Sequence, residues 1–383
     1  MTARWPSLNW TAMKKNLREV MDRWLRLVQR QMPHEILLSV SLPRSPAAQA
    51  EFEERDQTWK ERDCLCNSDP EWVVRQCQLN AEATNAIEDD TLPSASPHVH
   101  FGESVYSGLL GGKIRYIGTA SHTCSGAEPL LPTWDALDKL RLDDDNPVLK
   151  QVLKILELAA CRSGKEFFLG HFILIDALNL AVELRGTTQA YTDLFAFPDE
   201  LRRLMEFGIE LNEWFLRHQE RVIGPHNRAV SGGHPLTGRG PMQGTVSESV
   251  DAYTLCHPRT YVDFGLDYQS RLLQRIGGAM MHMHGTAVFD LLPHVAKLKG
   301  LLAVQVGNDL HGGESFPLLP RLCEARALAG DVPLDRLRLS AEEFELGIRA
   351  RLLVGNAHYV VPCESPDQAR RYIEMARNYR AEQ

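Results

Sequence analysis

Two histidines one residue apart carry the sharpest chemical signal in the sequence, where residues 279–285 read Ala-Met-Met-His-Met-His-Gly. Side chains two positions apart on a β-strand point to the same side, so His282 and His284 could share one ligand. Gly285 would permit a tight turn directly after the strand. Two hydrogen-bonded polar side chains at a strand end would explain the motif equally well.

A cysteine far along the chain is the third candidate ligand. The apolar run 359–361 is followed by Pro362 and Cys363, just before a helix that should begin near Pro366. In a closed barrel the first and last strands are neighbours, so a large separation in sequence need not mean a large distance. Two imidazoles and one thiolate are good ligands for Zn²⁺ and leave a fourth position for water or substrate. The alternative is a buried structural thiol.

Other candidate residues follow glycine-rich or apolar segments. Asp251 and Tyr253 come after the glycine-rich stretch 231–244, and an aspartate there could orient a substrate, take a proton or cap the following helix. A polar segment, 305–314, begins at the end of the apolar run 301–306 and would form a loop, although turn chemistry also explains its glycines. The residues of this loop that could contact substrate or complete a metal shell are Gln305, Asp309, His311 and Glu314.

A second His-x-His pair, which ends in His100, lies in an extended segment flanked by prolines. No cysteine stands close to it in the sequence, so a second metal site is not favoured. We expect His100 to line the substrate pocket or to lie on the surface.

The elements that must position these residues alternate between short apolar runs and amphipathic helices from about residue 100 onward. This rhythm predicts an α/β protein with a parallel sheet and outer helices, most economically a closed (β/α)₈ TIM barrel. Residues 1–85 should form a helical N-terminal extension that includes one strand at 36–42, and residues 86–383 the barrel. The expected helices are 146–162, 172–185, 198–222, 258–276, 287–298, 316–329, 340–351 and 366–381, and the expected later strands are 167–169, 280–284, 301–306 and 359–361.

Composition narrows the class of protein. The chain has 383 residues, is 44% hydrophobic and carries a formal net charge of −8, which argues against a nucleic-acid partner. The longest nearly apolar stretch, 167–182, is too short to span a bilayer comfortably, and the first residues lack the apolar core of a secretory signal. Eight thinly spread cysteines fit a reducing compartment. We therefore expect a cytoplasmic protein without a membrane partner.

The chain resembles the uroporphyrinogen decarboxylase superfamily of TIM barrels over roughly residues 85–383. The resemblance implies the barrel fold and places Asp251 and Tyr253 near the active site. The matching segments, in order, include Gly108-Leu109-Leu110-Gly111-Gly112, Tyr191-Thr192-Asp193-Leu194-Phe195, Val250-Asp251, His257-Pro258, His282-Met283-His284-Gly285 and Ser365-Pro366-Asp367.

Within this superfamily the sequence is most similar to the zinc-dependent methylcobamide:thiol (coenzyme M) methyltransferase branch. That branch carries His-x-Cys-Gly and a later cysteine, and the chain matches at His282, Gly285 and Cys363 but has His284 where the family has cysteine. The arginine-rich segment of the decarboxylases is absent. The resemblance implies zinc on His282, His284 and Cys363 at the C-terminal face of the barrel. Because an Asp-x-His-x-x-Gly segment is absent, any corrinoid would arrive on a partner protein.

Replacing the family cysteine by His284 changes the charge of the expected site. Zn²⁺ with two thiolates and one imidazole is neutral, whereas Zn²⁺ with His282, His284 and Cys363 carries +1. The added charge would weaken a bound sulfur as a nucleophile and favour Lewis-acid chemistry or activation of water. Alternatives to thiol methylation are therefore a decarboxylase or other lyase acting on a small acid or tetrapyrrole, a metal-assisted hydrolase, or a binding barrel without activity. The substrate and the oligomeric state, a homodimer included, stay open.

Overall fold

The chain is an α/β protein made of two compact units. The structure, a computed structural model, describes residues 13–62, 69–97, 101–102, 104–118, 123–163, 166–231, 247–308 and 316–382. The first unit contains Met1–Pro43, Ala83–Pro93 and Ser231–Gln383, and the second contains Arg44–Glu82 and Ser94–Val230.

A parallel sheet forms the centre of the first unit, with strand order β7-β8-β9-β10-β11-β1. β1 comes from the start of the chain and pairs along its whole length with β11 from the end, with Ile36 opposite Ala357. The predicted parallel sheet is thereby confirmed, and strands from the two ends of the chain are neighbours. The strands are β1 (Ile36–Ser41), β7 (Ser247–Ser249), β8 (Ala279–His282), β9 (Leu301–Gln305), β10 (Leu334–Arg338) and β11 (Ala357–Pro362).

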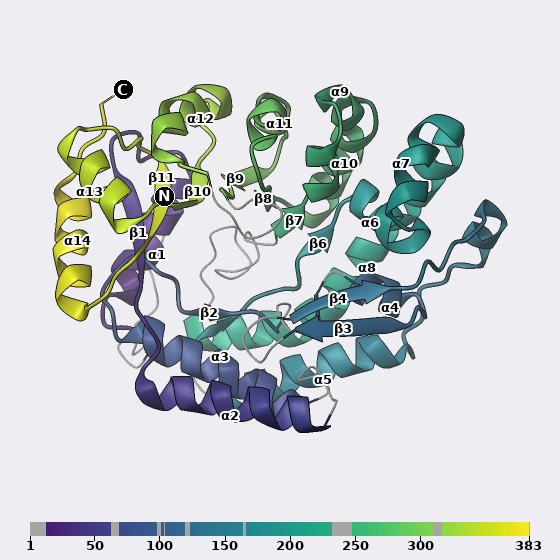
Figure 1. Cartoon of the computed structure of the whole chain (residues 1–383), viewed down its shortest axis with the longest axis horizontal. Coiled ribbons are helices and arrows are strands. Elements are labelled where there is room, and N and C mark those ends of the chain that lie inside the picture. Colours follow the sequence, from purple (N-terminus) through teal and green to yellow (C-terminus); the bar gives the residue numbers. More distant parts are fainter. Residues whose placement is uncertain are drawn as a thin grey trace. The chain divides into compact units, whose positions relative to one another are not determined.

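Helices connect successive strands of this sheet and lie outside them in Figure 1. α10 shows why: its buried residues Tyr268, Leu272 and Ile276 recur every four positions and form one apolar face. α13 begins with a capping box, in which Ser340 and Glu343 bond each other's backbone N–H groups. The helices are α9 (Pro258–Thr260), α10 (Leu266–Ile276), α11 (Val288–Val295), α12 (Leu322–Ala329), α13 (Ala341–Arg349) and α14 (Pro366–Asn378), with a π-helical turn η6 (Tyr261–Gly265) before α10.

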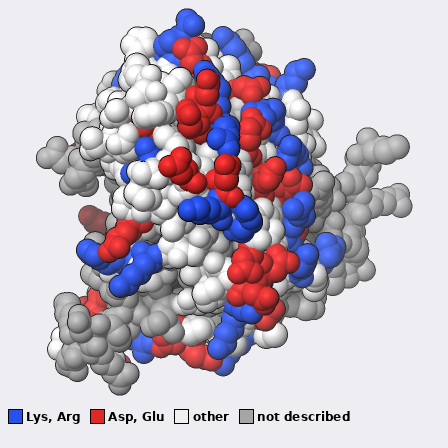
Figure 2. Space-filling view, turned by 90° about the vertical axis from the view of Figure 1, so that its right-hand side faces the viewer, with Lys and Arg blue, Asp and Glu red and all other residues white. Residues whose placement is uncertain are grey.

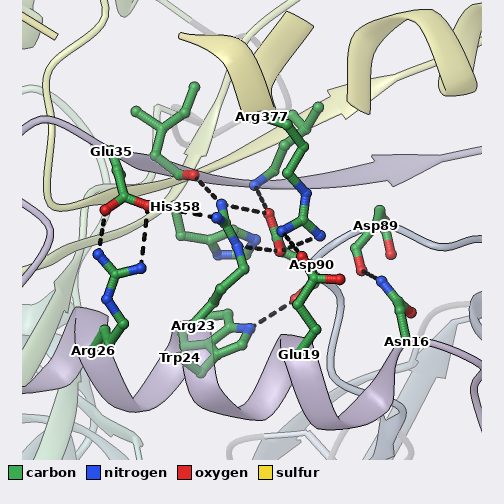
Figure 3. A network of polar contacts seen from close by, with 12 residues as sticks. Asn16, Glu19, Arg23, Trp24, Arg26, Glu35, Asp89, Asp90, His358 and Arg377 are labelled. Carbon is green, nitrogen blue, oxygen red and sulfur yellow. Dashed lines mark hydrogen bonds and ion pairs between the residues drawn. The ribbon is translucent and has the colours of Figure 1, made fainter. Parts of the chain in front are cut away.

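The N-terminal helix α1 (Leu17–Val28) is attached to β1 through a buried carboxylate, as Figure 3 shows. Asp90 accepts a hydrogen bond from Arg23 (2.8 Å) and another from the backbone N–H of Leu38 (2.9 Å). Trp24 donates from its indole to the backbone oxygen of Asp90 (2.7 Å). A buried charge needs such partners, so this contact fixes how the N-terminal segment packs.

The expected strand at 36–42 is confirmed by β1, which belongs to the central sheet rather than to a purely helical extension. The boundary at residues 85 and 86 between an extension and a barrel stays a prediction.

The second unit is mainly helical, with short strands. β2 (Ser94–Ala95) pairs in parallel with β5 (Phe168–Leu169), and β3 (Ile114–Gly118) forms an antiparallel pair with β4 (Thr123–Ala127) that the sequence did not predict. β6 (Leu174–Ile175) follows β5. The helices are α2 (Pro46–Arg62), α3 (Pro70–Asn85), α4 (Val105–Leu109), α5 (Pro147–Arg162), α6 (Ala177–Arg185), α7 (Thr187–Ala196) and α8 (Pro198–Ser231).

Helix α6 begins at Ala177, whereas the sequence suggested a helix from residue 172. Residues 174 and 175 are extended, and the carboxylate of Asp176 then caps the helix by accepting from the backbone N–H groups of Leu178 (2.6 Å) and Asn179 (3.1 Å).

Amide side chains of α8 serve the backbone around β5 and β6. Asn227 both accepts from and donates to Leu169 (3.0 and 3.1 Å), and Asn212 does the same for Ile175 (3.2 and 2.7 Å). Gln219 accepts from the N–H of Phe172 (2.8 Å). Two-residue strands leave buried backbone groups without ladder partners, and these amides supply them.

No helix in the described ranges is long and apolar enough to cross a membrane. On the face shown in Figure 2, acidic and basic side chains are interspersed, and neither sign forms a large continuous area.

Candidate metal centre

Asp251, His282 and His284 form a group that could hold a metal ion at the ends of two adjacent strands. One ligand atom from each side chain lies within 4.8 Å of the others. The group combines the predicted histidine pair with a residue that the sequence suggested as catalytic.

Strand geometry explains the histidine pair. β8 ends at His282, and a parallel bridge between His284 and Gly307 continues the extended conformation for two residues. The two rings therefore lie on the same side, with centroids 4.1 Å apart and planes at 89°. Gly285 then adopts a φ of +73°, a left-handed conformation that glycine adopts without strain. The turn predicted after the strand is thus present.

The register between β7 and β8 brings Asp251 to the histidines. Ser249 lies opposite His282, and the N–H of Val250 donates to the carbonyl of His282 (3.2 Å). Two residues beyond Ser249, Asp251 comes level with His284, and its Oδ2 lies 3.9 Å from the Nε2 of His284. Because this register depends on pairing between distant segments, the sequence did not reveal it.

The two carboxylate oxygens of Asp251 have different surroundings. Oδ2 accepts a hydrogen bond of 2.5 Å from the hydroxyl of Ser249, which orients the carboxylate. Oδ1 is buried and has no hydrogen-bond partner among the described residues. A buried acceptor of this kind normally has a partner, and a cation would provide one. The carboxylate therefore fits a metal ligand.

His282 is held in the form that a ligand requires. Its Nδ1 lies 2.6 Å from the Oε1 of Gln305, so the expected site residue Gln305 sits directly behind the ring. Burial lowers the pKa of His282 below its ordinary value, while the charge of Asp251 acts in the opposite direction. A neutral imidazole is the species that coordinates metals.

The group is accessible from solvent. The side chain of His284 is 28% exposed and that of Asp251 is 20% exposed, whereas Gln305 behind His282 is buried. One side of the group is thus enclosed by protein and the other is open. A metal bound here could reach a substrate, as a catalytic site requires and a closed structural site does not.

Cys363 is not a member of this group. It follows β11, and its backbone N–H donates to the carbonyl of Ser41 (2.8 Å). Alternation along β11 puts Cys363 on the face of Tyr359 and Val361, opposite to His358. Burial raises the pKa of the Cys363 thiol to about 11, and the nearby charge of Asp89 adds to this effect. The structure therefore gives Cys363 the surroundings of a protonated thiol, and its role as a ligand stays a prediction.

The remaining predicted site residues have varied positions. Tyr253 is buried in η5 (Asp251–Leu255), with its ring 5.3 Å from that of Tyr261. Gly265 lies so close that an added Cβ would stand 2.9 Å from the Cζ of Tyr253. Tyr253 thus packs tightly in the core. Four predicted residues lie outside the described part of the chain, namely His100, Asp309, His311 and Glu314.

Sequence reasoning missed three polar residues that extend the site behind His282. Asp335 accepts from the amide of Gln305 (3.0 Å) and lies 2.7 Å from the Nδ1 of His358, whose Nε2 lies 2.8 Å from the hydroxyl of Ser39. The sequence feature that could have identified them is a single charged or polar residue inside an otherwise apolar strand, because such a residue needs a hydrogen-bond partner when it is buried.

Comparison with known proteins supports the fold. No protein-family model matches the sequence, and no curated protein matches it. Among solved structures, a methyltransferase from Methanosarcina mazei is similar, with a TM-score of 0.59 and 12% sequence identity over 94% of this chain and 98% of that chain. At this identity the likeness shows that the two proteins share a fold, which can serve different reactions.

Proposed function

We propose that this protein is a metal-dependent methyltransferase that holds one zinc ion on Asp251, His282 and His284. The observation that carries the proposal is the convergence of their ligand atoms within 4.8 Å at the ends of β7 and β8. Two imidazoles and a carboxylate form a known zinc donor set with room for a substrate. A bound zinc ion would supply Lewis acidity.

The superfamily resemblance supports the type of reaction. Matching segments point to the methyltransferase branch of the uroporphyrinogen decarboxylase superfamily, and a methyltransferase shares the fold. We propose that a methylated corrinoid, carried by a partner protein, is the methyl donor and that a small thiol is the acceptor. The methyl group moves from cobalt to sulfur, both electrons of the cobalt–carbon bond stay on cobalt, and the thiol loses its proton.

This chain's residues would prepare the acceptor. Asp251, oriented by Ser249, contributes one negative charge, so that the site with Zn²⁺ carries +1. This charge would attract the thiol as its anion, although it also makes the bound sulfur a weaker nucleophile. The open side next to His284 would admit the thiol, while the buried side next to Gln305 keeps His282 in place.

The closed (β/α)₈ barrel belongs to the same proposal. Its support is the order of the parallel strands, in which β1 follows β11, together with the helix between each pair of successive strands from β7 to β11. In such a barrel the ends of β7 and β8 would lie at the face where barrel enzymes place their active sites.

Free methylcobalamin and 2-mercaptoethanesulfonate can replace the partner-bound donor and the unknown thiol in a test. Zinc-loaded protein purified without a histidine tag should form the methyl thioether and cob(I)alamin in equal amounts, and removal of zinc should stop the reaction. His282→Ala should lose both zinc and activity, whereas His218→Ala, a substitution in the second unit, should keep both. Zinc binding without thioether formation would exclude this reaction under the conditions of the assay.

The donor set favours metal-assisted hydrolysis as a second candidate. Two histidines and one carboxylate also hold zinc in hydrolytic enzymes, and a site of charge +1 favours activation of water. Zinc-dependent hydrolysis of a nitrophenyl ester by the wild type, lost in Asp251→Asn and without thiol methylation, would favour this candidate.

A further inference from the structure

A row of polar side chains, all buried except the half-buried His282, crosses the sheet behind the candidate metal centre, one from each of five neighbouring strands. It runs from His282 through Gln305, Asp335 and His358 to Ser39, and each member lies within 3.0 Å of the next. The strands follow in the order β8, β9, β10, β11 and β1. The row therefore connects the candidate ligand His282 to a carboxylate two strands away.

A β-bulge in β10 brings that carboxylate into the row. Leu334 lies opposite Ala357 and Leu337 opposite Tyr359, so β10 advances three residues while β11 advances two. The bulge therefore lies at Asp335 and Arg336. Arg336 adopts a φ of +52°, an unfavourable conformation for a residue with a side chain. Bulges commonly redirect a side chain next to a functional site. Here the bulge accompanies a fully buried acid.

The charge of Asp335 determines the direction of every hydrogen bond between it and His282. An ionised carboxylate only accepts, and the pKa of Asp335 lies below its ordinary value because hydrogen bonds and nearby positive charge outweigh the opposing effect of burial. Gln305 must therefore turn its NH₂ group toward Asp335 and its oxygen toward His282. That oxygen can only accept, so the Nδ1 of His282 must carry the proton. The lone pair then lies on Nε2.

We propose that Asp335 is a positioning residue that, through Gln305, fixes the tautomer of His282 with its proton on Nδ1 and its Nε2 free to bind the metal. The inference rests on the proposed metal site and explains which ring nitrogen of His282 would bind the metal. Partners of this kind, bonded to the second nitrogen of a histidine ligand, set ring orientation and metal affinity.

Replacing the carboxylate of Asp335 by an amide of the same shape should reverse the direction of the hydrogen bonds between residue 335 and His282. In Asp335→Asn the new side chain can still accept from His358, and its NH₂ group then faces Gln305. The amide of Gln305 turns over and presents its NH₂ group to the Nδ1 of His282. The proton of His282 moves to Nε2, which removes the lone pair from that ligand atom.

The tautomer can be measured without any metal. Long-range ¹H–¹⁵N spectra of metal-free protein labelled with ¹⁵N-histidine distinguish the two tautomers, and the spectrum of His282→Gln identifies the signals of His282. We expect the proton on Nδ1 in the wild type and in Asp331→Asn, and on Nε2 in Asp335→Asn. Asp331→Asn is the matched control, because Asp331 precedes β10 but pairs with Arg30 at the surface.

Zinc affinity gives the second readout. Competition with a chelator should show a fall of about 10- to 100-fold in Asp335→Asn and a change of less than about 3-fold in Asp331→Asn. If Asp335→Asn does not fold, Gln305→Met removes the acceptor of His282 and should give a mixture of both tautomers with a similar loss of affinity.

The outcomes separate this inference from the proposed function. A proton on Nε2 in the wild type, or an unchanged tautomer in folded Asp335→Asn, would overturn the inference even if zinc binds. If the wild type binds no zinc, the metal role of both proposals fails, and the tautomer spectra show whether Asp335 still positions His282.

Discussion

The two units contain buried polar side chains next to strands, but they use them differently. In the second unit the amides of Asn212, Gln219 and Asn227 bond backbone groups of residues 169–175. In the first unit His282, Gln305 and Asp335 bond one another, and Asp251 keeps a buried oxygen with no hydrogen-bond partner among the described residues.

This difference shows how to separate structural from functional polar residues. The amides are neutral and their bonds complete short strands, so folding alone explains them. The first unit instead places titratable groups side by side in a partly open site, where burying charged groups has an energetic cost that folding does not require. Substitutions in the first unit should therefore affect metal binding most, and those in the second unit should affect stability.

The largest expected effect is the loss of zinc from Asp251→Asn. Replacing a charged ligand by a neutral amide should weaken zinc binding by roughly 1000-fold, or about 4 kcal/mol. Isothermal titration or chelator competition measures the change. Cys363→Ser is the matched comparison and should shift the affinity by less than about 3-fold, because Cys363 lies outside the group. A larger loss of zinc affinity in Cys363→Ser than in Asp251→Asn would instead support the ligand set expected from the sequence, in which Cys363 binds the metal.

The sequence contained part of this site. Regular apolar runs predicted β1, β9 and β11, and strand periodicity placed His282 and His284 on one side. Asp251 was recognised as a candidate residue but not as their neighbour, because the register between β7 and β8 is a property of distant pairing.

Irregular elements were harder to predict. β10 was missed because the sequence Leu334-Asp335-Arg336-Leu337 interrupts the alternation of a strand, and the bulge that causes this appears only in the folded sheet. Gln305 was expected to contact substrate, but its position behind His282 depends on its pairing with Asp335, and a pairing between two strands is not visible in the sequence.

The next largest effect is expected in the second unit. Asn227→Leu keeps the size of the side chain but leaves the N–H and carbonyl of Leu169 without their bonds to it. Loss of these buried hydrogen bonds should lower the free energy of unfolding by about 2–3 kcal/mol, as measured by urea denaturation. Zinc affinity of the folded variant should stay within about 3-fold of the wild type, and a large loss of zinc would contradict the division between the two regions.

The smallest effect concerns pH. Burial lowers the pKa of His226 on α8, whose Nε2 lies 3.1 Å from the carbonyl of Phe167. Well above pH 6.5 the imidazole is neutral in both the folded and the unfolded state and contributes nothing to the pH dependence. Below that pH the unfolded chain takes up a proton that the folded chain accepts only at lower pH, so stability falls.

His226→Gln removes this titration and keeps a hydrogen-bond donor. Between pH 7 and pH 5 the variant should lose about 1 kcal/mol less stability than the wild type in urea denaturation. Equal losses in both proteins would show that another group determines the acid sensitivity of this region.

The identity of the metal ligands is tested most directly by X-ray absorption spectroscopy of the zinc-loaded wild-type protein. A site made by Asp251, His282 and His284 should show only nitrogen and oxygen neighbours, at about 2.0–2.2 Å. A sulfur neighbour at about 2.3 Å would place a cysteine on the metal and contradict this ligand set.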